Sequence, residues 1–236
     1  MPDASSSRWS DLDRPALDSA ALQTALTRDS ALWRSLEVVP EIGSTNAALT
    51  SAAADGTPEG AVLVAEHQVA GRGRLDQVTG VRASLKWPND LVAADGRKLA
   101  GILAETVTSP ATPMAVVVGV GLNVNTTADE LPDTGTSLSR VLGAAVDRGP
   151  VLLAFLRAVE RRYRHWTEVL GDPVSSGLAQ DYLAWSSTIG TEVAVTLPDG
   201  STLSGTAQAV DWDGRLVVAT GSGTVQLASG DVRHVR

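Results

Sequence analysis

Apolar and polar positions recur along the chain with two periods, and each period predicts a set of elements. Apolar residues three and four apart, as at Leu22, Ala25 and Leu26, are typical of helices that bury one face. Helices are predicted over residues 17–33, 44–56, 149–170 and 175–186. Short apolar runs bounded by turn residues indicate buried strands. Strands are predicted over residues 36–43, 60–68, 82–88 and 114–125, and a hairpin over 90–107 with its turn at Asp95-Gly96.

The pattern changes from Ile189 onward. Short apolar runs now alternate with Asp-Gly and Ser-Gly pairs, which favour tight turns between strands. Five short strands joined in this way predict a small antiparallel barrel. We therefore predict three units: an N-terminal segment with a helix over 1–37, a main domain over 38–187 and a C-terminal barrel over 188–236.

Composition excludes several classes of protein. The chain of 236 residues is 43% hydrophobic, enough for a sizeable core, and it has no cysteine for disulfides or thiolate metal sites. Its formal net charge of −8 disfavours nucleic acid as the main partner. It has neither an apolar run long enough to span a membrane nor a recognisable signal peptide, so we expect a cytoplasmic protein.

The cations are unevenly divided between the two basic residue types. The chain has 17 arginines and two lysines, Lys86 and Lys98. Such a bias towards arginine reflects genomic composition. A lysine that persists in this background is a candidate for a role that arginine cannot fill.

A Gly/Arg loop, residues 71–74, follows the strand predicted over 60–68. Gly71 and Gly73 allow backbone amides to approach a ligand, and Arg72 and Arg74 offer forked donors to a phosphate or carboxylate. The loop matches neither a phosphate-binding Walker loop nor a dinucleotide fingerprint. A solvated turn and a basic RNA-binding tract are the alternative interpretations.

The sequence "KWPND", residues 86–90, places a lysine between a strand and a proline turn. A lysine held stiffly there suits the negative charge that develops on a phosphate during displacement. Asn89 and Asp90 could hold a hydroxyl group or Mg²⁺. Alternatively, Lys86 is a surface residue beside a Pro-Asn-Asp turn.

Two further polar groups lie at element ends. Ser44, Thr45 and Asn46 begin a predicted helix, where they could take an anion or a carbonyl group or could simply cap the helix. Asn123 ends the strand predicted over 114–125 and could face a ligand or cap the strand end. The histidines, at 67, 165 and 234, lack metal-ligand spacing, although His67 adjoins the Gly/Arg loop.

Taken in order, these motifs resemble those of biotin protein ligases. "STN", "AEHQVAGRGR", "KWPND", "RKLAGILAE" and "GVGLNVN" follow that family's pattern, over roughly residues 38–236. The resemblance implies an α+β fold: a mixed-sheet catalytic domain of the biotin/lipoate ligase type over 38–187, with a C-terminal SH3-like β-barrel. It also implies the monofunctional type, without a DNA-binding domain.

The resemblance implies an ATP- and Mg²⁺-dependent enzyme that forms biotinyl-5′-AMP and transfers biotin to a lysine of a biotin carboxyl carrier protein. Lys86 and Arg72 are the catalytic candidates that it implies. Biotin contacts are assigned to Ser44, Thr45, Asn46, Gln68, Gly71, Arg72, Gly73, Arg74 and Lys86. ATP or adenylate contacts are assigned to Arg72, Arg74, Asn89, Asp90, Lys98, Gly101 and Asn123. We expect a monomer or homodimer.

The chain departs from the family pattern after Arg74. The family continues with a glycine, an arginine and a tryptophan, but Asp76 and Gln77 stand at the first two positions and the tryptophan is missing. The family also has a strand and a helix before "KWPND", and the roughly dozen residues here cannot hold them. Losing this unit should expose apolar surface and remove sheet pairing. A lineage deletion, an error in the gene sequence and a deliberately shortened gene all explain the gap.

Three other functions stay open. A catalytically impaired homologue would still bind biotin or the carrier domain. A lipoate ligase-like acyltransferase would share the fold, although "KWPND" and "GRGR" favour biotin. A nucleic-acid binder fits least, because the chain is acidic and has no recognition helix.

Overall fold

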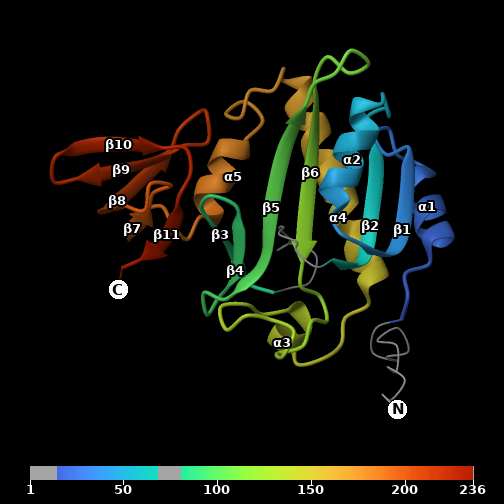
Figure 1. Cartoon of the computed structure of the whole chain (residues 1–236), viewed down its shortest axis with the longest axis horizontal. Coiled ribbons are helices and arrows are strands. Elements are labelled where there is room, and N and C mark those ends of the chain that lie inside the picture. The colour runs from blue at the N-terminus through green and yellow to red at the C-terminus, as the bar shows by residue number, and fades with distance from the viewer. Residues whose placement is uncertain (1–14, 69–80, 236) are drawn as a thin grey trace.

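The computed structural model describes residues 15–68 and 81–235, and in them two sheets precede a separate C-terminal sheet (Figure 1). The first sheet is parallel, and the second is antiparallel with the order β3-β4-β5-β6. The strands of the first are β1 (Ser35–Ile42) and β2 (Ala61–Gln68). Those of the second are β3 (Ala83–Lys86), β4 (Asp90–Ala93), β5 (Lys98–Val107) and β6 (Ala115–Leu122).

Five helices accompany these strands in the described residues. They are α1 (Ser19–Thr27), α2 (Thr45–Ala54), α3 (Leu138–Leu142), α4 (Arg148–Glu168) and α5 (Leu178–Trp185). Helix α2 connects β1 to β2 and contacts β2, β5 and β6, so it joins the two sheets. Helix α1 packs on β1 and α4, where Leu22, Leu26, Leu36 and Leu156 form one buried cluster.

The C-terminal sheet has five antiparallel strands in the order β10-β9-β8-β7-β11. They are β7 (Glu192–Thr196), β8 (Thr202–Val210), β9 (Leu216–Thr220), β10 (Gly223–Leu227) and β11 (Asp231–His234). Alternate residues point into a core that includes the fully buried Val193, Val195, Leu216 and Val218. The α+β class and the SH3-like C-terminal sheet expected from the sequence are thereby confirmed.

Most predicted elements are present, but the first helix is shorter than predicted. It ends at Thr27 rather than at residue 33. Ser30 Oγ accepts from the backbone N–H of Trp33, and Glu160 of α4 accepts from the N–H groups of Ala31 and Leu32. These side chains bind amides that a continued helix would bond internally, so the chain turns away. Helix α3 was not predicted.

The two sheets of the main domain are not paired with each other over the described residues. Within residues 15–68 and 81–235, β6 has no neighbour beyond β5, and Figure 1 shows β2 and β6 as strands of separate sheets. Large apolar side chains on or next to β5 and β6 are exposed: Leu103, Met114, Val116 and Val118. Over the described residues, both features agree with the loss of sheet pairing and the exposure of apolar surface expected from a missing strand and helix.

Candidate active site

Lys86 ends β3 beside a turn that the rest of the sheet holds in place. The Trp87–Pro88 peptide bond is cis, and Lys86 pairs with Asp90 across the turn. Asn89 donates from Nδ2 to the Ile102 carbonyl at 2.8 Å, while its own carbonyl accepts from Ile102 N–H at 2.9 Å. The Asn89 amide therefore fixes the turn to β5, and Lys86 projects from a rigid frame.

Asp90 and Lys98 form an ion pair on adjacent strands. Both side chains are partly exposed, so we expect the pair to contribute little to the free energy of unfolding, about 1 kcal/mol or less. Asp90 also lies opposite Gly101, and Gly101 lies opposite Gly121. The register thus places four of the predicted residues, Lys86, Asp90, Lys98 and Gly101, at one end of the antiparallel sheet.

Asn123 follows β6 at this same end. Its N–H donates to Leu99 O at 3.0 Å, and its Nδ2 donates to Thr136 O at 3.1 Å. Thr136 N–H in turn donates to Lys98 O at 2.8 Å. The side-chain amide of Asn123 therefore secures the loop before α3. This contact corresponds to the second interpretation of Asn123, as a residue that caps the strand end.

The "STN" residues begin α2, directly after β1. Ser44 is the N-cap, and its Oγ accepts from Ala47 N–H at 3.1 Å. Asn46 is buried and donates from Nδ2 to Glu105 of β5 at 2.7 Å. The amide of Asn46 therefore faces the antiparallel sheet, whereas Ser44 and Thr45 lie at the helix start.

The remaining predicted residues lie at or beyond the end of β2. Gln68 is the last residue of β2, and its backbone is in register with Ile42 of β1. Because the two strands are parallel, "STN" and the Gly/Arg loop both leave the carboxyl edge of this sheet, where α/β folds bind ligands. Gly71, Arg72, Gly73 and Arg74 lie outside the described residues.

Asn46 connects these two groups of predicted residues. Its partner Glu105 and the carbonyl of Leu103, 3.5 Å from Nδ2, lie on β5 beyond Gly101. Leu103 is two residues along the strand from Gly101, which corresponds to about 7 Å. The start of α2 therefore lies against β5, the strand that also carries Lys98 and Gly101.

The sequence did not indicate that Trp87 joins the two domains. Its side chain is 3% exposed and packs into the core of the C-terminal sheet with Val193, Val195 and Leu216. Trp87 directly follows Lys86 in the sequence, but nothing local in "KWPND" indicates a partner more than 100 residues away. Burial and, after it, the charge of Lys86 lower the pKa of nearby His234.

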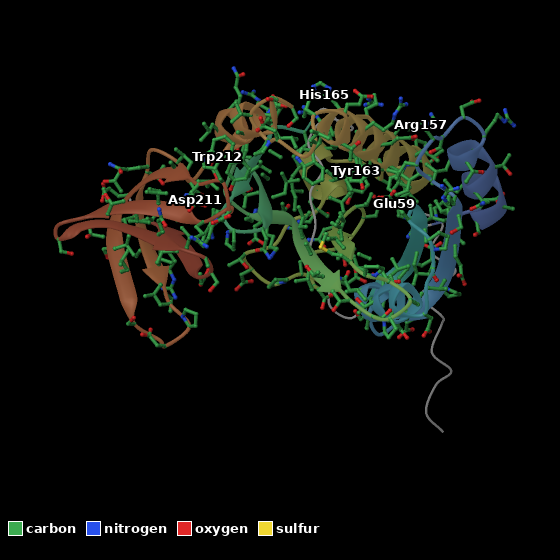
Figure 2. The ribbon with its side chains drawn as sticks, turned by 90° about the horizontal axis from the view of Figure 1, so that it is seen from above. Glu59, Arg157, Tyr163, His165, Asp211 and Trp212 are labelled. Atoms are coloured by element: carbon green, nitrogen blue, oxygen red, sulfur yellow. The ribbon has the colours of Figure 1, made fainter. Side chains whose placement is uncertain are left out.

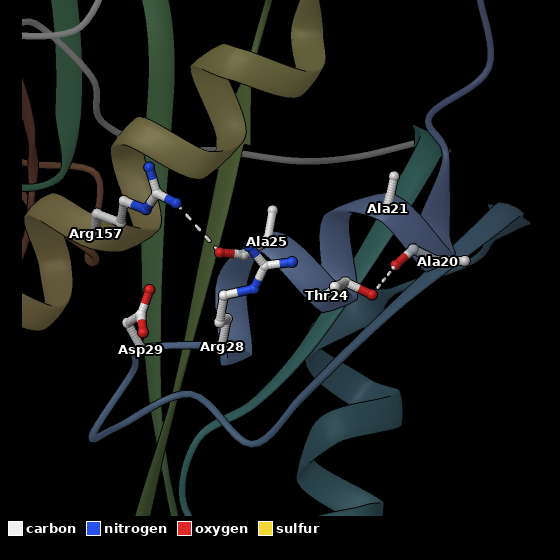
Figure 3. A pocket seen from close by; sticks show the side chains of 7 residues that line it. All are labelled: Ala20, Ala21, Thr24, Ala25, Arg28, Asp29 and Arg157. Carbon is white, nitrogen blue, oxygen red and sulfur yellow. Dashed lines mark hydrogen bonds between the residues drawn. The ribbon is translucent and has the colours of Figure 1, made fainter.

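An open hollow lies elsewhere, between α1 and α4 (Figure 3). Its wall includes Arg28, Asp29 and Arg157, and Arg157 donates to the Ala25 carbonyl at 3.2 Å. None of the predicted site residues lines it. Nor do the residues of the two described segments include a cluster of three or more His, Cys, Asp or Glu suited to a metal ion.

Comparison with known proteins identifies the family. Residues 188–235 match the model of the biotin protein ligase C-terminal domain, and residues 75–123 match that of the biotin/lipoate A/B protein ligase family. A biotin–[acetyl-CoA-carboxylase] ligase from Mycobacterium tuberculosis is 38% identical over 94% of this chain and 97% of its own length. The chain belongs to the biotin protein ligase family. The expected ligase function, and with it an enzymatic role, is thereby confirmed.

Two further biotin ligases are similar to this chain, one in sequence and one in fold. A bifunctional ligase/repressor from Bacillus subtilis is 29% identical over 81% of this chain and 71% of its own length. The biotin protein ligase of Aquifex aeolicus in complex with biotin and ATP superposes with a TM-score of 0.66, covering 86% of this chain and 100% of that one. At 22% identity this second likeness concerns the fold.

The alignment with the mycobacterial ligase also bears on the gap after Arg74. It extends over 270 positions, more than the 236 residues of this chain, so some of its positions have no counterpart here. The match to the biotin/lipoate family model begins at residue 75, directly after the Gly/Arg loop. The length of the alignment agrees with a missing internal segment, and the family match begins beside the expected gap.

In the described parts of the chain, no helix is long and apolar enough to cross a membrane.

Proposed function

We propose that this biotin protein ligase catalyses both steps of an ATP-dependent biotinylation. In the first step, a carboxylate oxygen of biotin attacks the α-phosphorus of ATP, an O–P bond forms, and pyrophosphate leaves. In the second, a lysine amine of a biotin carboxyl carrier protein attacks the acyl carbon of biotinyl-5′-AMP. AMP leaves and the amine loses its proton as the amide forms. The mycobacterial relative's name, that of a biotin–[acetyl-CoA-carboxylase] ligase, supports this carrier class.

Lys86 is the residue that we expect to stabilise the first transition state. Its ammonium group projects from a fixed turn, and among the described residues it has no carboxylate partner, whereas Lys98 is paired with Asp90. A preorganised cation is most effective where negative charge accumulates, here between the biotin carboxylate and the α-phosphate. Arg72, in the Gly/Arg loop, is proposed as the second catalytic cation.

The other predicted residues divide between the two substrates. We propose that Ser44, Thr45 and Gln68 contact biotin, with Asn46 holding the helix start against β5. Gly71, Gly73 and Arg74 complete the loop over biotin and the adenylate. We propose that Asn89, Asp90, Lys98, Gly101 and Asn123 shape the adenylate side, because the register brings them to one sheet end.

Mg²⁺ is proposed to enter with the nucleotide. Asp90 is paired with Lys98, and the described residues provide no three-residue acidic or histidine cluster, so this part of the protein does not fit a resident ion. Mg²⁺ characteristically binds through substrate phosphates and retains water ligands. We also propose a cytoplasmic location and a monomeric or homodimeric state. The proposed division of the chain is into units over residues 1–37, 38–187 and 188–236.

The separation of the two sheets favours one alternative, a homologue that binds biotin or its carrier domain without forming the adenylate. Biotin-dependent exchange of labelled pyrophosphate into ATP distinguishes the two, with Lys86→Ala as the inactive control. Exchange by the folded chain supports the ligase. Biotin binding by calorimetry without exchange supports the binding homologue. Acylation of a lipoyl domain in place of a biotin carrier would indicate a lipoate ligase.

The gap itself can be tested directly. Re-sequencing the gene across codons 74–82 would show whether coding sequence is missing. If the short sequence is genuine, inserting the segment that separates the two corresponding motifs in the mycobacterial ligase should restore pairing between the sheets and raise the exchange rate. Equal rates before and after insertion would mean that the chain does not need this unit.

A further inference from the structure

The residues on both sides of Lys86 are bound by the C-terminal half of the chain. Ser187 N–H donates to the Leu85 carbonyl at 2.8 Å. Trp87 N–H donates to Thr188 Oγ1 at 3.1 Å, and Trp87 Nε1 donates to Gly214 O at 2.9 Å. On its other side, β3 pairs with β4. The backbone at Lys86 is therefore held between the antiparallel sheet and the C-terminal domain.

Trp87 links the KWPND turn to the C-terminal core. It belongs to the same buried cluster as side chains of β7, β9, β10 and β11, namely Val193, Val195, Leu216, Val218, Leu227 and Val232. The ring is 3% exposed, so this contact ties the turn to the C-terminal core. The loop that carries Gly214 also bears Trp212, which is exposed, and Figure 2 shows Asp211 and Trp212 on the C-terminal domain.

Thr188 determines how Trp87 is held. It is fully buried, and its Oγ1 lies 3.3 Å from His234 Nε2 as well as accepting from Trp87 N–H. A hydroxyl has one proton to donate, so it can accept from Trp87 while donating to a neutral His234. Removing this hydroxyl leaves the buried Trp87 N–H without its acceptor, which is costly in a protein interior.

We propose that Trp87 and Thr188 are positioning residues for adenylate formation, through which the C-terminal domain sets the place of the Lys86 ammonium group. The proposal rests on the ligase function above, with Lys86 as its catalytic cation. A reacting group displaced by about 1 Å can lose about 100-fold in rate, so a small shift of the turn is sufficient. Thr188 and Trp87 affect the reaction only through Lys86, and neither is placed in contact with substrate.

The kinetic test uses conservative variants of the full chain. Thr188→Val and Trp87→Phe should each lower kcat of pyrophosphate exchange about tenfold or more, with KM for biotin within about twofold. Thr188→Ser keeps the hydroxyl and should retain most of the wild-type rate. Trp33→Phe is the matched control, because Trp33 Nε1 donates to the Leu156 carbonyl at 3.0 Å in the α1–α4 region. A folded Thr188→Val variant with unchanged kcat would overturn the proposal.

A second measurement does not depend on activity. The chain has two lysines, so reductive ¹³C-dimethylation, which preserves their charge, gives one NMR signal for Lys86 and one for Lys98 besides that of the N-terminus. Thr188→Val should shift or broaden the Lys86 signal and leave the Lys98 signal unchanged. In Thr188→Ser, the Lys86 signal should stay close to its wild-type position. An unmoved Lys86 signal in the folded variant refutes the positioning role. If wild type shows no exchange but the Lys86 signal still moves, the ligase proposal fails while the structural coupling stands.

Discussion

The Asn46 side chain fills the space that a side chain on Gly119 would need. A Cβ at Gly119 would lie 1.8 Å from Asn46 Oδ1, while Asn46 Nδ2 donates to Glu105 at 2.7 Å. The helix that begins with "STN" is thus seated on β5 and β6 by one buried amide and one missing side chain.

Gly119→Ala should therefore destabilise the protein by about 1–3 kcal/mol, the usual cost of overpacking. Urea unfolding measures this loss. Asn46→Ala removes the obstructing atoms, so the double variant should lose less than the sum of the two single variants. Strict additivity in this double-mutant cycle would contradict the contact. Gly143→Ala would not serve as a control, because the φ angle of Gly143 is positive and an alanine there would be strained.

Lys86→Ala should lower adenylate formation by about 100-fold or more, because the preorganised cation is lost from the transition state. Lys86 is not part of the buried core, so the midpoint of urea unfolding should change little. Biotin-dependent pyrophosphate exchange is the measurement. Arg164→Ala, which removes an exposed cation from α4, should leave exchange intact. An active Lys86→Ala variant would remove this residue from the mechanism.

His234 should make the protein less stable in mild acid. Burial and then the Lys86 charge hold its pKa in the folded state below the ordinary value of 6.5. As the pH is lowered, His234 therefore takes up a proton in the unfolded chain before it does so in the folded protein. The free energy of unfolding falls as the pH drops from 6.5 through the folded-state pKa. Above 6.5 both states are neutral and the effect vanishes. Urea unfolding across this range should show a shallower pH dependence for His234→Gln, and identical slopes would contradict the shift.

The exposed valines of β6 should promote self-association. Val116 and Val118 are 58% and 56% exposed on an edge strand, and apolar sheet edges favour contact between molecules. Val116→Thr with Val118→Thr should lower the associated fraction in sedimentation velocity and change stability by about 0.5 kcal/mol or less. Val117→Thr, at a buried neighbour, should instead destabilise the fold. An unchanged associated fraction in the double variant would exclude β6 as the surface through which the molecules associate.

Local pattern was sufficient for most elements, and it supplied the residues proposed for the candidate site. Turn chemistry at Asp95-Gly96 and the proline after Trp87 fixed the hairpin and the end of β3, because both act within a few residues. The first helix was predicted too long, since Glu160, about 130 residues away, binds the amides that would have continued it. Asn46 and Asn89 proved to bond β5.

The sequence by itself determined the family, the order of the motifs and the gap between the Gly/Arg loop and "KWPND", since each is written in adjacent residues. Only the tertiary structure decided which side chains hold the site together. Trp87 meets Thr188 and Gly214 across 101 and 127 residues, and Asn46 meets Glu105 across 59. Such contacts depend on how sheets and domains pack, and neither periodicity nor turn propensity specifies a partner at that separation.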